Sequence, residues 1–166
     1  MEGLLGRLHH DLRRDAGDHH GDLHRGPQGH GNGNAAVHAV AAALGTAAHG
    51  AGDGHAITGI AIGVSEGYVR YQVHLLNGGW LPEVDGYDID DDENGYAGNG
   101  RTPIDALKAV FYTPDGYEYQ CLYMQVSPKG MDEYYPVQID DQTVNGQDGY
   151  AGCFGKYIDK VQLWVE

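Results

Sequence analysis

The sequence predicts an all-β protein built from antiparallel hairpin repeats of about 50 residues. A glycine-rich motif at residues 94–100 precedes an apolar run at 104–111, and both return at residues 148–155 and 158–165. A partial third copy comprises residues 51–54 and 57–64. Each copy alternates short apolar runs with turn residues and is too small to bury an apolar face alone. The copies are therefore expected to stack into one β domain.

The repeats also predict the domain boundaries. A partial copy at residues 51–67 is followed by full copies at 68–116 and 117–166, behind a leader at residues 1–50. Three partial copies permit pseudo-threefold packing. A small sandwich and a trefoil-like barrel are therefore the two expected architectures.

The first full copy contains a hairpin, an acidic loop and a long strand. Apolar and polar residues alternate from Val69 to Leu76, and Asn77-Gly78 is a strong hairpin signal. Thr113-Pro114-Asp115-Gly116 has the chemistry of a turn. The expected elements in order are strands at 57–64 and 69–76, a return strand at 80–84, an acidic loop at 85–94 and a strand at 104–112.

The second full copy is expected to be longer than the first. Tyr71-Gln72-Val73 is echoed by Tyr119-Gln120-Cys121, 48 positions later, whereas Tyr96 is echoed by Tyr150, 54 positions later. This difference predicts about six extra residues between hairpin and motif. In this alignment Met131 stands at the position of Trp80, and residues 131–139 replace the return strand.

The leader differs in composition from the rest of the chain. It contains eight of the 10 histidines and no aromatic residue, so it is expected to be disordered or to be a truncated or frame-shifted start. His20 and His24 have helical spacing for a metal, but the neighbouring glycines favour a low-complexity tract. A weak helix is expected at residues 34–48, where Val37, Val40 and Leu44 share a helical face.

Charge and cysteine content narrow the possible partners. The formal net charge of −14 disfavours nucleic acid and anionic membranes, which would repel the protein. No apolar run is long enough to span a bilayer, and no signal peptide is visible. Cys121 and Cys153 permit one disulfide, as in a secreted domain, or remain two thiols.

Several short motifs recur in the same order and carry a family resemblance. They are Tyr71-Gln72-Val73-His74 and the segments at residues 78–84, 94–98 and 103–106. Together they resemble the C-terminal repeats of peptidoglycan hydrolases from Gram-positive bacteria and their phages, and they are similar to the target-recognition domain of zoocin-type lytic exoenzymes. A looser likeness links them to clostridial hydrophobic repeats with a Gly-Trp pair. The resemblance covers residues 51–166.

The resemblance implies a secreted, non-catalytic module that holds a lytic enzyme, such as an endolysin, on the bacterial cell wall. Its partner would be a cell-wall glycan or stem peptide, at an extracellular or cell-wall location. One alternative is a fragment of an amidase, muramidase or peptidase whose catalytic domain is missing. The other is a self-associating surface protein, and the sequence leaves its oligomeric state open.

Aromatic residues at glycine-rich and acidic turns are the candidate ligand contacts, because their rings suit sugar and peptide surfaces. Trp80, Tyr87, Tyr134 and Tyr135 differ between the copies, which favours a role in recognition. Glu83 and Asp85 lie between Trp80 and Tyr87 and complete the predicted site. Tyr96 and Tyr150 recur in the same motif and are expected to anchor its turn instead.

The acidic loop is a possible calcium site. Asp88, Asp90, Asp92 and Asn94 are spaced like the first half of a calcium loop, but Arg101 stands where an EF-hand needs glutamate. A looser calcium site and a solvated acidic turn are the two alternatives. No other cofactor is expected, and no arrangement of nucleophile, base and supporting acid predicts catalysis.

Overall fold

The described part of the chain folds into strands alone. The computed structural model describes residues 37–43, 54–91 and 93–166, and of residues 37–43 only the backbone. Within these ranges there is no helix, which confirms the all-β prediction. The nine strands are β1 (Val37–Ala43), β2 (Ile57–Val64), β3 (Tyr68–Leu75), β4 (Ala97–Gly98), β5 (Ile104–Tyr112), β6 (Leu122–Pro128), β7 (Gln138–Ile139), β8 (Ala151–Gly152) and β9 (Ile158–Val165).

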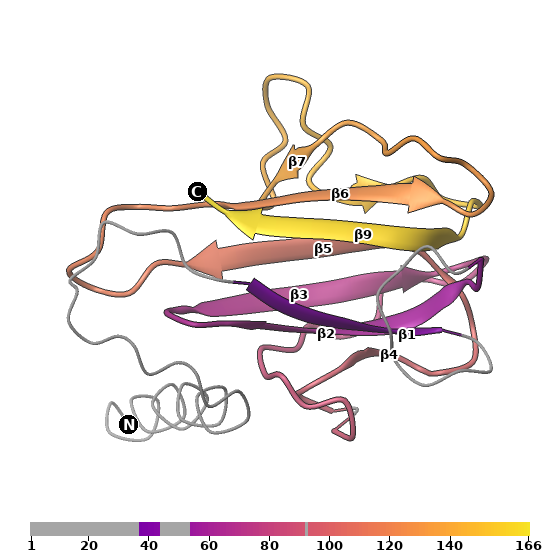
Figure 1. Cartoon of the computed structure of the whole chain (residues 1–166), viewed down its shortest axis with the longest axis horizontal. Helices are drawn as coiled ribbons and strands as arrows, with labels where there is room; N and C mark the ends of the chain where they lie inside the picture. The colour runs from indigo at the N-terminus through magenta and orange to yellow at the C-terminus, as the bar shows by residue number, and fades with distance from the viewer. Residues whose placement is uncertain (1–36, 44–53, 92) are drawn as a thin grey trace.

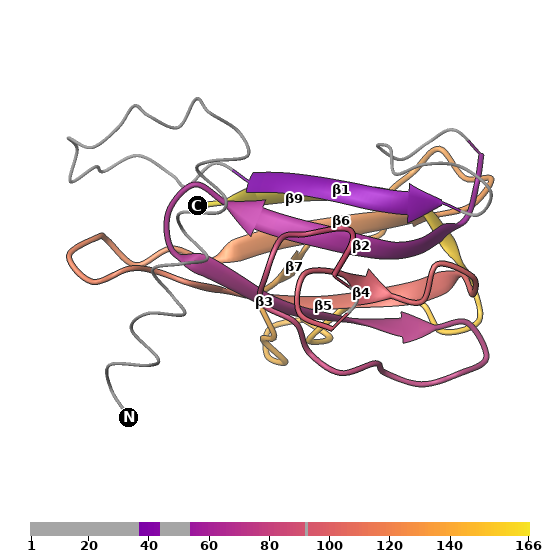
Figure 2. The same cartoon turned by 90° about the horizontal axis from the view of Figure 1, so that it is seen from below.

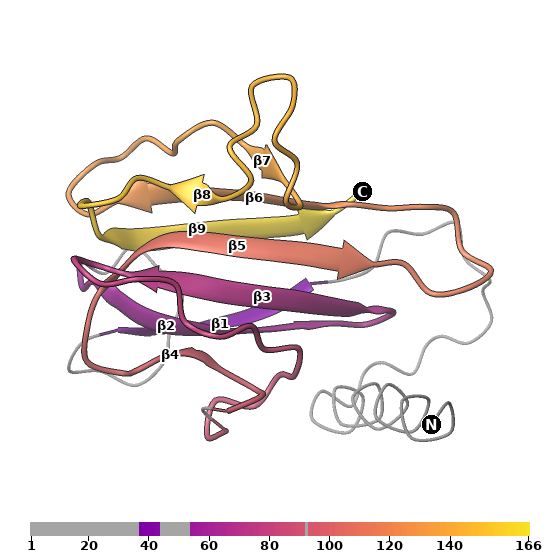
Figure 3. The ribbon, with the colours of Figure 1, turned by 180° about the vertical axis from the view of Figure 1, so that it is seen from behind.

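The strands form three antiparallel sheets around one apolar core (Figure 1). Their orders are β1-β2-β4, β3-β5-β8 and β7-β6-β9. Each sheet contains one pair of long strands, namely β1–β2, β3–β5 and β6–β9 (Figure 3). The described strands therefore make a small layered β fold and do not close into a barrel.

Equivalent positions in the three sheets contribute to the same core. In each long pair the register shifts near one end of the strands. Ile60 on β2, Leu107 on β5 and Val161 on β9 lie at the same distance from that shift, so they are equivalent positions. Ile60 and Leu107 are buried, and Val161 packs against the same cluster. This arrangement is what three stacked copies of a hairpin repeat require.

The pairing registers correct the predicted alignment of the two full copies. Tyr71 on β3 corresponds to Met124 on β6, 53 positions later, because each lies three residues before the residue that precedes the same register shift, His74 on β3 and Ser127 on β6. The predicted echo of Tyr71 at Tyr119 is wrong, since Tyr119 precedes β6 and is 79% exposed. The alternation of Leu122, Met124 and Val126 into the core sets the register instead.

The corrected alignment leaves one extra residue and no six-residue insertion. Leu75 and Gly79 correspond to Pro128 and Glu133, so the turn between them is longer by one residue in the second copy. Trp80 then corresponds to Tyr134, and the predicted match of Trp80 with Met131 is wrong. Both positions therefore carry an aromatic residue.

The hairpin after β3 is held by its turn and by isolated bridges. Asn77 has a φ of 56°, and Leu75 N–H donates to Gly79 O at 3.0 Å. His74 bridges to Trp80, and Tyr71 bridges to Val84. The hairpin prediction is confirmed, although Pro82 cannot donate to a ladder and no continuous return strand forms.

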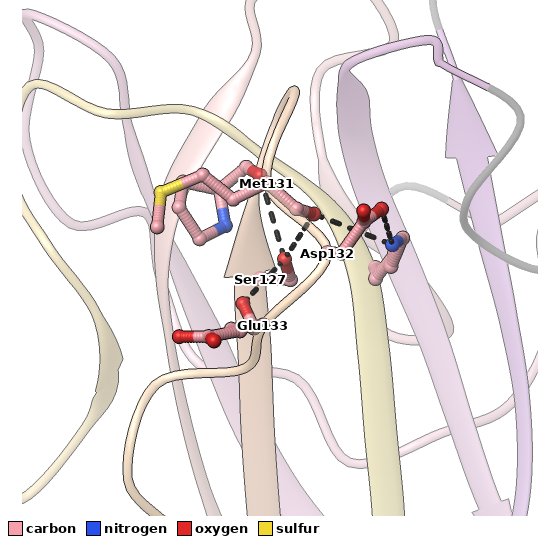
Figure 4. A network of polar contacts seen from close by, with 6 residues as sticks. Ser127, Met131, Asp132 and Glu133 are labelled. Carbon is pink, nitrogen blue, oxygen red and sulfur yellow. Dashed lines mark hydrogen bonds and ion pairs between the residues drawn. The ribbon is translucent and has the colours of Figure 1, made fainter.

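The second copy closes the same hairpin with a side chain. In the first copy the N–H of Leu75 closes the hairpin. The equivalent residue in the second copy, Pro128, has no N–H, and the hydroxyl of Ser127 supplies the donor instead (Figure 4). Its hydroxyl lies 2.8 Å from Glu133 O and 3.0 Å from Met131 O, and its single proton serves one of them at a time. The predicted return strand at 131–139 shrinks to β7.

β1 contradicts the expected helix at residues 34–48. Residues 37–43 are a strand, and β1 pairs with β2 along its whole length (Figure 2). Every residue of β2 is buried, so its backbone groups need partners within the protein, and this requirement outweighs the helix propensity of alanine. The β fold therefore includes part of the predicted leader, while the histidines of residues 1–36 lie outside the described residues.

The recurring glycine-rich motif joins neighbouring sheets. β4, from the first copy, pairs with β2, and β8, from the second copy, pairs with β5. Tyr96 before β4 is buried, with its ring against Gly59, as expected of a turn anchor. Tyr150 before β8 is half-buried and contacts other rings. The same motif thus builds the fold in both copies but presents its tyrosine differently.

Replacing Tyr71 by phenylalanine is expected to lower the free energy of unfolding by about 1–2 kcal/mol. The buried Tyr71 hydroxyl lies 2.8 Å from Gly86 O and 3.0 Å from Gly95 O, and so joins both ends of the acidic loop. Burial raises the pKa of Tyr71 well above its ordinary value of 10.0. Chemical denaturation of both proteins near neutral pH measures the loss.

The raised pKa of Tyr71 also predicts an alkaline effect. Above pH 10.0 the unfolded tyrosine ionises while the folded one stays protonated, so stability falls as pH rises. Other buried tyrosines contribute to the same decline, but Tyr71→Phe should flatten it. An equally steep decline in both proteins would contradict the assignment to Tyr71.

Candidate functional site: an aromatic face on the central sheet

Four rings gather at one end of the β3-β5-β8 sheet, which we call the central sheet. We call these four residues the aromatic cluster: His74, Trp80, Tyr150 and Phe154. The centroids of His74 and Phe154 are 4.3 Å apart, and Tyr150 stacks on Phe154 at 5.0 Å. Trp80 lies edge-on to Tyr150 at 5.8 Å. Trp80 is 36% exposed and Phe154 50% exposed. The cluster is thus pre-assembled yet open to solvent.

Two different copies supply these rings. The turn at Asn77-Gly78 returns the chain so that Trp80 lies opposite His74. The motif of the next copy crosses to β5 through β8, which brings the flanking Tyr150 and Phe154 to the same end of the sheet. A single repeat could not form the cluster.

Asp105 fixes the loop that carries Phe154. Its side chain is fully buried, and Oδ1 lies 2.6 Å from His74 Nδ1, which donates to it. Oδ2 accepts from Gly155 N–H at 2.7 Å, and the main-chain oxygen accepts from Cys153 N–H at 3.1 Å. The carboxylate therefore orients the His74 ring and holds the loop after Phe154, and the main-chain oxygen of Asp105 holds the loop before Phe154.

A row of polar side chains continues from the cluster along the sheet. Residues of β3 at alternate positions point outward and face matching residues of β5. We call these side chains the outer strip: Tyr68, Arg70, Gln72 and His74 on β3, with Lys108, Val110 and Tyr112 on β5. From Tyr68 to His74 the strip spans about 20 Å.

Two basic side chains of the outer strip and two acidic side chains that border it make polar contacts along its length. Lys108 Nζ lies 5.6 Å from the centroid of the Trp80 ring, and Gln72 Nε2 donates to Glu83 Oε1 at 3.2 Å. Arg70 forms an ion pair with Asp85 at 3.7 Å. The strip ends at Tyr112, which stacks on Tyr68 with centroids 4.6 Å apart. Aromatic surfaces at both ends thus flank a polar centre.

The structure brings some of the predicted ligand residues together. Trp80 belongs to the aromatic cluster, and Glu83 and Asp85 border the outer strip through Gln72 and Arg70. Burial raises the pKa of the Tyr135 hydroxyl, and the neighbouring Cys153 adds to the shift, so Tyr135 lies beside the loop of Phe154. Trp80, Glu83 and Asp85 therefore share one face, and Tyr135 lies near Cys153 at its edge.

The other two predicted aromatic residues lie elsewhere. Tyr87 packs over Gly63 at the end of β2, and burial raises the pKa of its hydroxyl. Tyr134 is 38% exposed and lies between β6 and β7, where it is the counterpart of Trp80. Two residues near Trp80 have different counterparts near Tyr134, because Ser127 replaces His74 of the aromatic cluster and Gln162 replaces Lys108 of the outer strip.

The carboxylates of the acidic loop cap the loop's own backbone. Asp88 Oδ1 accepts from Asp90 N–H, and Asp91 Oδ1 accepts from Glu93 and Asn94 N–H. Among the described residues no three histidine, cysteine or acidic side chains are grouped to hold a metal. Asp92 lies outside those residues, so the calcium site stays a prediction. Cys121 and Cys153 are free thiols, which corresponds to the second of the two predicted alternatives.

Sequence reasoning missed His74, Asp105, Tyr150 and Phe154 as site residues. The available signal was a polar residue at the start of an apolar strand, since Asp105 follows Ile104 and Asp159 follows Ile158. Both aspartates are buried, and a buried carboxylate requires partners. The partners of Asp105 come from a segment about 50 residues away, which pairs with β5 through β8. No local sequence pattern encodes such a pairing.

The His74 ring contacts the side chains of Asp105, Trp80 and Phe154. Exposed rings beside amide, ammonium and carboxylate groups suit ligands with both apolar faces and hydrogen-bonding groups.

The chain matches no protein-family model, no curated protein and no solved structure. In the described segments no helix has the length and apolar character needed to cross a membrane.

Proposed function

We propose that this protein is a non-catalytic module that binds the bacterial cell wall and targets a lytic enzyme to it. The observation that carries the proposal is the open aromatic cluster at the end of the outer strip. Trp80 and Phe154 offer ring surface to solvent, and Lys108 lies beside Trp80. This combination suits a sugar ring, whose CH groups pack on aromatic faces while its hydroxyls reach polar side chains.

The dimensions of the strip favour an extended polymer as the ligand. The row from the aromatic cluster to Tyr68 is about 20 Å long, whereas one sugar or amino acid would occupy only a part of it. Polar groups along the row, including Gln72 and Arg70, are half-exposed. A glycan strand or stem peptide of peptidoglycan fits such a row better than an isolated small molecule.

Charge selects among the wall polymers. At a net charge of −14 the protein would repel the phosphates of teichoic acid, although salt screens charges beyond about 8 Å. Peptidoglycan carries amines as well as carboxylates and is the better electrostatic match. The residue resemblance to cell-wall-binding repeats of peptidoglycan hydrolases points to the same ligand.

Trp80→Ala is expected to weaken binding to purified sacculi by roughly 30-fold, which corresponds to about 2 kcal/mol for a central aromatic contact. Phe154→Ala should weaken it to a similar extent. The measurement is a pull-down titration on sacculi with and without teichoic acid. Tyr119→Ala is the matched control, because Tyr119 is 79% exposed and lies outside the strip.

Two results would count against this proposal. If Trp80→Ala and Phe154→Ala bind sacculi as tightly as the unaltered protein, the aromatic cluster is not the contact surface. If binding disappears when teichoic acid is removed, the ligand is not peptidoglycan. A folding check by circular dichroism separates loss of binding from loss of structure.

A further inference from the structure

A cleft lies at the other end of β3 and β5, away from the aromatic cluster. Its volume is about 370 Å³, within the range of small-ligand sites. The turn between β2 and β3 forms one wall, and the connection after β5 forms the other. Three tyrosines and two carboxylates line it, and we call it the tyrosine cleft: Tyr68, Tyr112, Tyr117, Glu66 and Asp115.

Local backbone geometry brings the two walls together. Gly67 has a φ of 74°, and a Cβ atom there would lie 2.4 Å from Tyr112 O, so only glycine lets the turn approach β5 this closely. On the other wall, Tyr117 N–H donates to Pro114 O at 3.2 Å and closes the turn that carries Asp115. The cleft is therefore a product of two tight turns.

The aromatic walls of the cleft suit a cation. Tyr68 and Tyr112 stack with an interplanar angle of 5°, and Tyr112 is 38% exposed. Arg70 Cζ already lies 5.7 Å from the Tyr112 ring centroid, at a cation–π distance. The ring is thus in a setting that attracts positive charge.

The charges around the cleft leave it negative. Arg70 is the described cation near it, and Asp85 lies 3.7 Å from that guanidinium. Glu66 is half-buried and Asp115 is exposed, and in the described part of the chain neither forms an ion pair. Two carboxylates and three aromatic rings line the same cleft, and both kinds of group attract an ammonium ion.

We propose that the tyrosine cleft binds a primary ammonium group. The group would come either from a lysine-type side chain of a peptide or from an amino sugar. Its charge would face Glu66 and Asp115, while its adjacent CH₂ or CH groups would pack on the rings of Tyr112 and Tyr117. This site stands on its own contacts and does not depend on cell-wall binding by the aromatic cluster.

Small amines test the site directly. Nα-acetyl-lysine methylamide and glucosamine would be titrated separately into isotopically labelled protein, and chemical shifts of the three tyrosine rings recorded. Nα-acetyl-norleucine methylamide and N-acetylglucosamine are the matched neutral probes. We expect saturable shifts with at least one amine, absent with its neutral match, and the responding amine identifies the source of the ammonium group.

Charge-removing variants complete the test without enlarging or emptying the cleft. Glu66→Gln and Asp115→Asn should each weaken amine binding by about fivefold, and the double variant more strongly. Trp80→Ala should leave amine binding unchanged, which separates this site from the proposed cell-wall contact. The proposal is overturned if neither amine binds better than its neutral match, or if the double variant binds the amine as the unaltered protein does.

Discussion

Asp105→Ala is expected to lower the free energy of unfolding by about 3 kcal/mol and to release the loop that carries Phe154. The buried carboxylate is the acceptor for His74 Nδ1–H and for Gly155 N–H. Its removal leaves two donors of part-buried hydrogen bonds without this acceptor, and each such loss costs up to about 1–3 kcal/mol. Denaturant unfolding measures the change in stability. Sacculus binding should fall as well, because Phe154 loses its fixed position.

Asp105→Asn keeps the shape of the side chain but removes its charge, and so separates the two contributions to stability. The amide keeps one oxygen to accept from Gly155, and its NH₂ group can donate to His74 if the ring changes tautomer. We therefore expect a loss of only about 1 kcal/mol. Glu118→Gln, on an exposed residue, is the control and should change stability by less than about 0.5 kcal/mol. Equal stability of Asp105→Ala and the unaltered protein would refute the assigned role.

Gly152→Ala is expected to destabilise the protein by more than about 3 kcal/mol. Gly152 has a φ of 129°, and an added Cβ would lie 2.3 Å from Asp105 O and 2.8 Å from Ala106 Cα. Both obstacles are backbone atoms of β5, so no side-chain rotation relieves the clash. The substitution should separate β8 from β5 and with it the second copy's contribution to the aromatic cluster. Thermal and denaturant unfolding report the effect.

Gly155→Ala provides the matched control in the same loop. Gly155 also has a positive φ, of 89°, but no atom lies within 4 Å of its added Cβ. Its cost should be limited to backbone strain of about 1 kcal/mol. Gly98→Ala, at the equivalent position in the first copy, should behave like Gly152→Ala, because its Cβ would lie 2.4 Å from Thr58 O. Similar losses at Gly152 and Gly155 would show that close packing against β5 is not the cause.

Divergence between equivalent positions explains why the repeats carry one aromatic cluster instead of several. The glycine-rich motif that joins neighbouring sheets is shared, since Gly98 and Gly152 both approach the backbone of the preceding copy. The ring positions differ, because Trp80 and His74 of the first full copy correspond to Tyr134 and Ser127 of the second. The residues that join neighbouring sheets are thus repeated, and the residues of the aromatic cluster are not.

The sequence by itself determined the β class, several strands and the recurring turn. Strands at residues 57–64 and 104–112 were predictable because apolar runs there are bounded by glycine and proline turns. The Asn77-Gly78 hairpin was predictable because its turn chemistry is local. The role of Tyr96 as a turn anchor followed from its return in a fixed motif.

Only the tertiary structure decided the repeat register, the first strand and the composition of the site. The alanine-rich segment of β1 pairs with β2 because a buried neighbour needs its hydrogen bonds, and this requirement is absent from local propensity. The tyrosine motif at residue 119 resembled a core strand, but burial of Leu122, Met124 and Val126 set the register five residues further on. Asp105 meets Gly155 across 50 positions because β8 crosses to β5, and pairings over such separations are chosen by packing of the whole core.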